Sequence, residues 1–228
     1  MAELPPEPGG PLSRAFPQRL AAVIRWKDGE EARQAVLAAV RAGIASVEVT
    51  SGTPGAFDLV RELRQRLGDS RVVGAGTITT AELARAALAS GAQYLVTPYL
   101  SEDVAAVARP HDVLLVMGAT TPSEIARAQA LGADLVKVFP AGPIGGASYI
   151  AAIRGPMPEV PLWVSGGIRV TEIADYLKAG AQVVGLTADL FRPQLLSAHR
   201  WEEIESLART ALEAVAAPGS GAADPPTR

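Results

Sequence analysis

Eight short apolar runs recur along the chain, separated by segments with helical periodicity. The runs cover residues 21–25, 46–50, 71–76, 94–98, 113–118, 135–140, 161–167 and 183–187. Segments 30–43, 79–91, 122–132 and 170–180 carry apolar side chains at the i, i+3, i+4 spacing of an amphipathic helix, and each ends at glycine. Eight strand–helix units predict an α/β fold, namely a single-domain (β/α)8 or TIM barrel with a closed parallel sheet.

An open, doubly wound sheet is the structural alternative. Such sheets usually have fewer strands and a glycine-rich phosphate loop after the first one. Here the first run is followed by WKDGEEA, which lacks that loop, so the barrel is favoured. Residues 1–16 and 217–228 are rich in Pro, Gly and small polar residues and are predicted to be disordered tails around a barrel of residues 17–216.

Composition narrows the class of protein. Only 5% of the residues are aromatic while 48% are hydrophobic, so Ala, Val, Leu and Ile must build the core. A net charge of −3 argues against a nucleic-acid partner. The absence of cysteine excludes disulfides, thiolate catalysis and cysteine metal sites. We find no apolar run of membrane-spanning length and no signal peptide, and therefore expect a soluble cytoplasmic protein without a membrane partner.

A lysine stands inside one of the apolar runs. Strand periodicity places Leu135, Lys137 and Phe139 on one face and the flanking valines on the other, which suits a lysine inside the barrel. Burial favours the neutral form of an amine, and a neutral amine can attack a ketone. The chain has only three lysines, at positions 27, 137 and 178. The alternative is a lysine that reaches solvent at a strand end or pairs with a carboxylate.

Two further charged side chains belong to the predicted strands. Glu48 shares an inward face with Ser46 and Thr50, which makes its carboxylate a candidate general acid or base. It could equally be the counter-ion of Lys137 or Arg25. Arg25 ends the first strand and could bind a carboxylate in a bidentate contact or hold Glu48. A purely structural role at the barrel rim is the alternative for this arginine.

Small-residue turns follow three of the predicted strands, at 74–77, 165–167 and 185–187. Backbone N–H groups at such turns bind anions, and the phosphate site of a barrel often follows strands seven and eight. The turns could also simply end the strands.

Several of these segments together resemble a known family. Glu48 within VEVT, GAGTI (74–78), TPY (97–99), KVFPA (137–141) and SGGI (165–168) occur in the order and spacing of the 2-keto-3-deoxy-6-phosphogluconate (KDPG) and 4-hydroxy-2-oxoglutarate (KHG) aldolases. The resemblance spans roughly residues 18–215. KVFPA with the upstream glutamate and GAGT is fairly specific, whereas GAGT or SGG alone would mean little.

The resemblance implies a class I aldolase that needs no metal and no other cofactor. Lys137 would form an imine with the C2 ketone of a keto-acid substrate, and the iminium would accept electrons as the C3–C4 bond breaks. Glu48 would shuttle protons. The products would be pyruvate and an aldehyde, glyceraldehyde 3-phosphate from a 2-keto-3-deoxy-6-phospho sugar acid or glyoxylate from 4-hydroxy-2-oxoglutarate.

The resemblance also implies substrate-binding residues and an assembly. Arg25 and Thr77 would bind the substrate carboxylate region, and Pro98 and Phe139 would shape the pyruvyl pocket. The turn after strand seven and the turn after strand eight would hold a distal phosphate, which adds Ser165, Gly166, Gly167 and Thr187 to the substrate-binding set. Members of the family form trimers, so the resemblance implies a homotrimer.

Three positions depart from the family pattern. Gly52 stands where some members have an arginine, Met117-Gly118 stands where Pro-Gly is frequent, and Leu186-Thr187 replaces a common Gly-Ser turn. The missing arginine removes one anion contact. The choice between these substrates, including a 6-phosphogalactonate analogue, therefore stays open.

Other functions on the same barrel are a phosphosugar isomerase or epimerase and a non-catalytic binding protein. Epimerases usually need paired carboxylates or histidine and metal ligands. The two histidines, His111 and His199, precede the fifth strand and lie in the C-terminal helical region, and we expect both at the surface rather than on a metal. The presence of both Lys137 and Glu48 argues against a binding protein.

Overall fold

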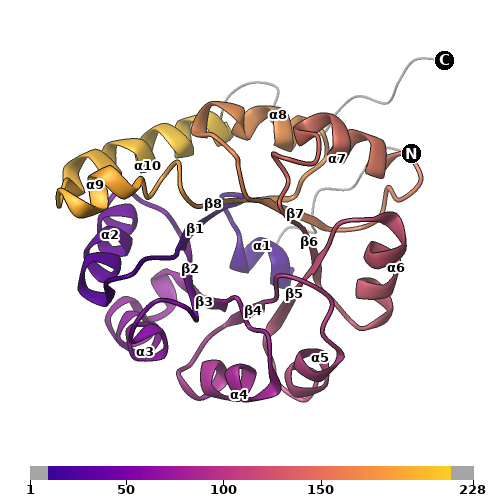
Figure 1. Ribbon diagram of the computed structural model, residues 1–228, viewed down its shortest axis with the longest axis horizontal. Coiled ribbons are helices and arrows are strands. Elements are labelled where there is room, and N and C mark those ends of the chain that lie inside the picture. Colours follow the sequence, from indigo (N-terminus) through magenta and orange to yellow (C-terminus); the bar gives the residue numbers. More distant parts are fainter. Residues whose placement is uncertain (1–9, 217–228) are drawn as a thin grey trace.

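The computed structural model describes residues 10–216 of the chain, and within them eight parallel strands close into a barrel (Figure 1). Each strand pairs with the next one along the chain, and β1 pairs with β8, which closes the sheet. The predicted (β/α)8 barrel is thereby confirmed, and the open sheet is excluded. The strands are β1 (Leu20–Ile24), β2 (Ser46–Thr50), β3 (Val72–Gly76), β4 (Tyr94–Val96), β5 (Leu114–Ala119), β6 (Leu135–Val138), β7 (Leu162–Ser165) and β8 (Val183–Leu186).

Helices surround the barrel and cover the outer face of the sheet (Figure 1). They are α2 (Gly29–Arg41), α3 (Ala56–Leu67), α4 (Ala81–Ala89), α5 (Glu102–Ala108), α6 (Pro122–Ala130), α7 (Gly146–Arg154), α8 (Ile173–Lys178), α9 (Pro193–Ser197) and α10 (Trp201–Ala216), with short 3-10 turns at Gly68–Ser70 and Val170–Glu172. The first helix, α1 (Pro11–Ala15), lies instead across one end of the barrel (Figure 1). Across residues 10–216, no helix has the length and apolar character needed to cross a bilayer.

Local sequence signals explain where these helices begin and end. The side chains of Asp28, Thr80 and Ser101 each accept a hydrogen bond from a backbone N–H of the first turn, and Thr121 forms a capping box with Glu124. The four segments predicted to stop at glycine do so. Each of these glycines has a positive φ, which lets the chain leave the helix without a steric penalty; they are Gly43, Gly91, Gly132 and Gly180.

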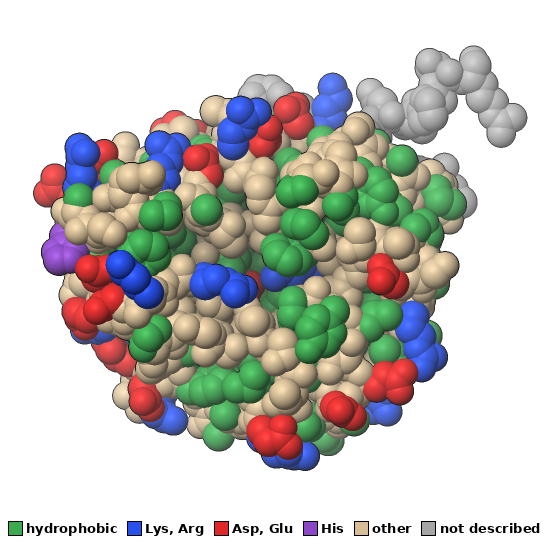
Figure 2. Space-filling model, in the orientation of Figure 1, with side chains coloured by type: hydrophobic (Ala, Val, Ile, Leu, Met, Phe, Trp, Pro, Cys, Tyr) green, Lys and Arg blue, Asp and Glu red, His purple; other side chains and the backbone are tan. Residues whose placement is uncertain are grey.

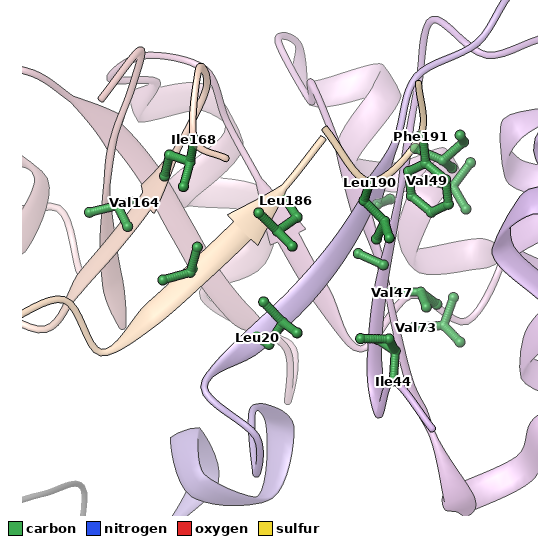
Figure 3. Close-up of a cluster of buried hydrophobic side chains, with 14 of the residues drawn as sticks. Leu20, Ile44, Val47, Val49, Val73, Val164, Ile168, Leu186, Leu190 and Phe191 are labelled. Carbon is green, nitrogen blue, oxygen red and sulfur yellow. The ribbon is translucent and has the colours of Figure 1, made fainter. Parts of the chain in front are cut away.

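The outward-facing side chains of the strands pack against the helices and form the larger apolar core. Figure 3 shows part of it, with Val47 and Val49 of β2 among leucine, valine and isoleucine side chains. These residues are fully buried, as the alternation in the sequence predicted for a strand covered by helices.

A second, smaller core fills the barrel interior. Phe16 enters it from below and meets the rings of Tyr94 and Trp163, each at a centroid distance of 5.1 Å and edge-on. Helix α1 closes this amino-terminal end of the barrel, and the backbone oxygen of Ala15 accepts a hydrogen bond from Ser46, the first residue of β2.

The structure differs from the sequence-based expectation over residues 10–16, which were predicted to belong to a disordered tail. They form α1 and its C-cap, because Ala15 and Phe16 bury their apolar surface in the open floor of the barrel. That burial depends on the closed sheet and leaves little trace in a segment rich in Pro and Gly. Residues 1–9 and 217–228, also predicted as tails, lie outside the described residues.

Candidate active site

Strand β2 places Glu48 inside the barrel. Its alternation turns Val47 and Val49 toward the helices and Glu48 toward the axis, where the side chain is fully buried. The carboxylate lies over Gly76 of β3, and a Cβ at that glycine would come within 1.6 Å of Oε1. Only glycine at this position leaves room for the carboxylate.

Strand β6 places Lys137 in the same interior. The lysine is 7% exposed, and its Nζ lies 5.3 Å from the ring centroid of Phe139. In the sheet Lys137 is in register with Gly118 on one side and Trp163 on the other. The amine is therefore enclosed by the sheet, as the strand pattern predicted, and is not directed to bulk solvent at a strand end.

Glu48 and Lys137 line one cavity, and the charge of Lys137 acts on the Glu48 carboxylate. Burial raises the pKa of Glu48 above its ordinary value, and the positive charges of Lys137 and Arg25 act in the opposite direction. Neither carboxylate oxygen has a hydrogen-bond partner among the described residues. A buried carboxylate without partners, beside an amine, is well suited to take up and release protons.

The cavity that joins them opens at the carboxyl-terminal ends of the strands and has a volume of about 430 Å³. Basic and hydrophobic side chains border the centre of the barrel face drawn in Figure 2. Eight of the residues predicted from the sequence line this one cavity: Arg25, Glu48, Thr77, Pro98, Lys137, Phe139, Ser165 and Thr187. The structure thus brings together side chains from β1, β2, β6 and β7 and from the loops that follow β1, β3, β4, β6 and β8.

Arg25 and Thr77 form one rim of the cavity. Nη2 of Arg25 donates to Oγ1 of Thr77 at 2.8 Å, and the hydroxyl of Ser51 donates to the backbone oxygen of Thr77, also at 2.8 Å. Thr77 has a φ of +57°, an uncommon conformation for a β-branched residue. Strain of this kind concentrates at functional sites, where neighbouring contacts hold it.

Two predicted residues do not line the cavity. Gly166 and Gly167 follow β7 with φ of +88° and +73°, so both take a left-handed conformation. A Cβ at Gly166 would lie 2.8 Å from the ring of Phe139, and one at Gly167 would lie 3.0 Å from Pro143. The glycines permit close packing beside Phe139, and their part in phosphate binding stays a prediction.

Sequence reasoning missed six residues of the cavity wall, namely Val23, Trp26, Thr50, Ala188, Phe191 and Pro193. Thr50 carried a usable signal, because it shares the inward face of Glu48. Trp26 follows Arg25 directly, and its indole N–H donates to Glu31. Phe191 and Pro193 come from the segment after β8, and no local pattern links that segment to the cavity.

The opposite end of the barrel has a larger hollow of about 630 Å³, beside α1 and lined by Arg14, Arg109 and His111, among others. Neither Lys137 nor Glu48 lines it, so it is separate from the candidate chemistry. His199 lies at the surface and pairs with Glu31. Within residues 10–216, no group of three or more His, Asp or Glu side chains is arranged to hold a metal ion.

Comparison with known proteins finds relatives of this chain. The family model described as KDPG and KHG aldolase matches residues 13–207. The 2-dehydro-3-deoxy-phosphogluconate aldolase of Treponema pallidum is 31% identical over 86% of this chain and 93% of its own length. The KHG/KDPG aldolase of Escherichia coli K12 is also 31% identical, over 84% of this chain and 89% of its own. A crystal structure of KDPG aldolase from Legionella pneumophila, with pyruvate captured as a covalent carbinolamine, has a TM-score of 0.80 at 26% identity and covers 89% of this chain and 98% of that one.

Proposed function

Because the chain belongs to the KDPG and KHG aldolase family, we propose that it is a lyase that cleaves a 2-keto acid through an imine on Lys137. The substrate class is a 2-keto-3-deoxy-6-phospho sugar acid, 4-hydroxy-2-oxoglutarate, or both. The products are pyruvate and glyceraldehyde 3-phosphate in the first case, and pyruvate and glyoxylate in the second.

One observation carries this proposal: an amine and a carboxylate, both buried, line the same cavity. Lys137 and Glu48 come from β6 and β2, and both side chains are buried. Burying two ionisable groups costs free energy, and a fold without a use for them would be at least as stable with apolar residues there. The Legionella relative holds pyruvate as a carbinolamine, which supports amine chemistry at the matching site.

The reaction begins with the neutral amine of Lys137, which attacks the C2 carbonyl carbon and forms a carbinolamine. Protonation of the carbinolamine hydroxyl releases water and leaves an iminium ion. A base then removes the proton of the C4 hydroxyl, the C3–C4 bond breaks, and its electron pair moves into the iminium to give an enamine while the aldehyde leaves. Protonation of the enamine at C3 and addition of water release pyruvate and regenerate the amine.

Glu48 is the acid and base for these steps. Burial raises the pKa of Glu48 above that of a free carboxyl group. The positive charges of Lys137 and Arg25 keep this pKa below that of a buried carboxyl group without charged neighbours. The carboxyl group gives its proton to the carbinolamine hydroxyl and, once ionised, accepts the proton of the C4 hydroxyl. The amine of Lys137 is consumed when the imine forms and is restored when pyruvate is released.

The rest of the cavity binds the substrate. Arg25 and Thr77, joined by a hydrogen bond, hold the C1 carboxylate at the rim. Pro98 and Phe139 form the apolar wall around the pyruvyl carbons. Ser165, Gly166, Gly167 and Thr187, which follow β7 and β8 or end them, take the distal phosphate through hydroxyl and backbone N–H groups.

A homotrimer is part of the proposal. Tyr99 and Phe139 are the large hydrophobic side chains left exposed in the described part of the chain, at 51% and 36%. Phe139 lines the substrate cavity, whereas Tyr99 does not and would be covered by a packed subunit. Sedimentation of the purified protein checks this assembly. A cytoplasmic location stays a prediction from the sequence.

Turnover of defined substrates tests the function. Pyruvate release is measured with a 2-keto-3-deoxy-6-phosphogluconate, its 6-phosphogalactonate epimer and 4-hydroxy-2-oxoglutarate, each with and without a chelator. We expect cleavage of at least one that the chelator leaves unchanged. Inactivation by the chelator would instead indicate a metal-dependent aldolase, and turnover of none of the three would overturn the assignment.

A further inference from the structure

Tyr94 is a titratable residue inside the barrel that the proposed reaction does not use. It is fully buried, and its hydroxyl has no hydrogen-bond partner among the described residues. Both oxygens of Glu48 and the indole Nε1 of Trp163 share that property. Buried polar atoms without a partner are uncommon in folded proteins, so unpaired donors and an unpaired carboxylate in one small interior call for a joint explanation.

The register of the sheet brings Tyr94 toward Glu48. Glu48 pairs with Gly74 on β3, and the pairing of Ala75 with Leu95 places Gly74 beside Tyr94 on β4. Gly74 has no side chain, and the phenol ring occupies the space above it. A Cβ there would lie 2.4 Å from Cζ of the ring. The ring therefore leans across β3 toward β2, the strand that carries Glu48.

The carboxylate of Glu48 lies over Gly76, the next inward-facing position of β3 after Gly74. Its Oε1 would be 1.6 Å from a Cβ at Gly76, just as Cζ of Tyr94 is close to the corresponding position at Gly74. Inward positions two residues apart on a strand are separated by about 6.6 Å. The phenol ring and the carboxylate therefore lie over neighbouring inward-facing positions of β3, and no direct hydrogen bond joins them.

Two aromatic neighbours keep the phenol in this orientation. Phe16 packs edge-on against the ring at 5.1 Å, and Trp163 lies at 6.0 Å with the planes tilted by 48°. Burial raises the pKa of Tyr94 well above its ordinary value, and the negative charge of Glu48 raises it further. The phenol therefore keeps its proton and can only act as a neutral donor toward the carboxylate.

We propose that Tyr94 is a positioning residue for Glu48: its O–H donates, through one buried water, to the carboxylate and holds the ionised form facing Lys137. The inference rests on the proposed function, because it concerns the acid and base of that reaction. The other charged groups that face Glu48 are Lys137 and Arg25, and both are unchanged in the variants below.

Tyr94→Phe tests this role, since it removes the hydroxyl and keeps the ring. A donor to the carboxylate favours the ionised form, so its loss raises the pKa of Glu48. We expect the limb of the kcat–pH profile on which activity rises with Glu48 ionisation to move to higher pH by about half to one unit. At neutral pH we expect kcat to fall about three- to tenfold with KM nearly unchanged. Tyr176→Phe, a buried tyrosine on α8 outside the barrel, is the matched control and should leave the profile in place.

A double-mutant cycle separates positioning from a general packing effect. In a Glu48→Gln background the carboxylate is absent, so adding Tyr94→Phe should cause no further loss of kcat. If Tyr94→Phe lowers kcat by the same factor in both backgrounds, or leaves the pH limb at its wild-type position, the proposal is overturned. Reductive trapping of pyruvate by the wild-type protein is run alongside. Without trapping by the wild type the proposed function itself fails, whereas trapping together with an unmoved pH limb refutes only the role of Tyr94.

Discussion

The inward-facing and outward-facing side chains of the barrel strands are similarly buried but differ in chemical type. On the outward face, Val136 and Val138 of β6 are fully buried among aliphatic side chains. On the inward face of the same strand, Lys137 is 7% exposed and lies beside a cavity. Strand β2 repeats the contrast, with valines outward and Glu48 inward.

The difference shows that burial has two uses in this molecule. Outward burial removes apolar area from water and stabilises the fold. Inward burial removes ionisable groups from water, which costs stability, and places an amine and a carboxylate beside the cavity. Substitutions on the two faces should therefore separate stability from activity.

The largest effect is expected at Lys137. Lys137→Met keeps a long side chain but removes the nucleophile, so kcat for pyruvate release should fall by at least about 10⁴-fold. The melting temperature should not fall, because a buried amine is replaced by an apolar group. Lys178→Met, at the exposed end of α8, is the control and should keep full activity. Comparable turnover by the Lys137 variant would remove the inward face from the chemistry.

Glu48→Gln is expected to have the next largest effect. The amide matches the carboxyl group in shape but cannot exchange protons, so kcat should fall about 10²- to 10³-fold while substrate still binds. Steady-state kinetics and a binding isotherm for pyruvate measure the two quantities. A variant with normal kcat would show that Glu48 is only a counter-ion of Lys137.

The stability of Glu48→Gln relative to the wild type should depend on pH. The folded-state pKa of Glu48 is raised, chiefly by burial, so the folded protein binds a proton that the unfolded chain has lost. The free energy of unfolding contributed by this group therefore falls as pH rises from the ordinary carboxyl pKa, about 4.3, to the raised value. Urea unfolding should show Glu48→Gln gaining stability relative to the wild type from pH 4 to pH 8. An advantage independent of pH would contradict the direction of this shift.

Gly76→Ala should reduce activity without removing a reacting group. The added methyl would overlap Oε1 of Glu48, and the carboxylate would have to move. A displacement of this size costs about 10²-fold in kcat. Gly52→Ala is a matched control, because no atom lies within 4 Å of a Cβ there, and it should leave kcat unchanged. Equal effects of the two substitutions would show that the space over Gly76 is unimportant.

The smallest effect on activity is expected on the outward face. Val138→Ala, next to Lys137 in the chain, should lower the free energy of unfolding by about 2 kcal/mol, since it leaves a cavity in the outer core. We expect kcat to stay within about twofold of the wild type. Chemical unfolding and the pyruvate assay measure both. A large loss of kcat would mean that the two faces are not independent.

Much of this contrast could be predicted from the sequence. Strand alternation alone assigned Lys137 and Glu48 to the inward face, and helix periodicity with terminal glycines located four of the outer helices. Both signals are local, and burial follows from them once the barrel closes.

Features that depend on tertiary packing were not predictable in this way. Phe16 belongs to a segment whose composition is typical of a tail, yet it fills the barrel floor. Trp26 and Phe191 reach the cavity from loops after β1 and β8, which only the closed sheet brings together. The clearance at Gly76 for Glu48 arises between strands, and strand register is not visible in a single sequence.

Reductive trapping tests the central claim most directly, because it identifies the reacting amine. The protein is incubated with pyruvate and borohydride and then digested, and the masses of its peptides are measured by mass spectrometry. We predict one pyruvyl adduct, on the peptide that contains Lys137, and none in Lys137→Met. An adduct on Lys27 or Lys178 instead, or no adduct although pyruvate is shown to bind, would contradict the imine mechanism.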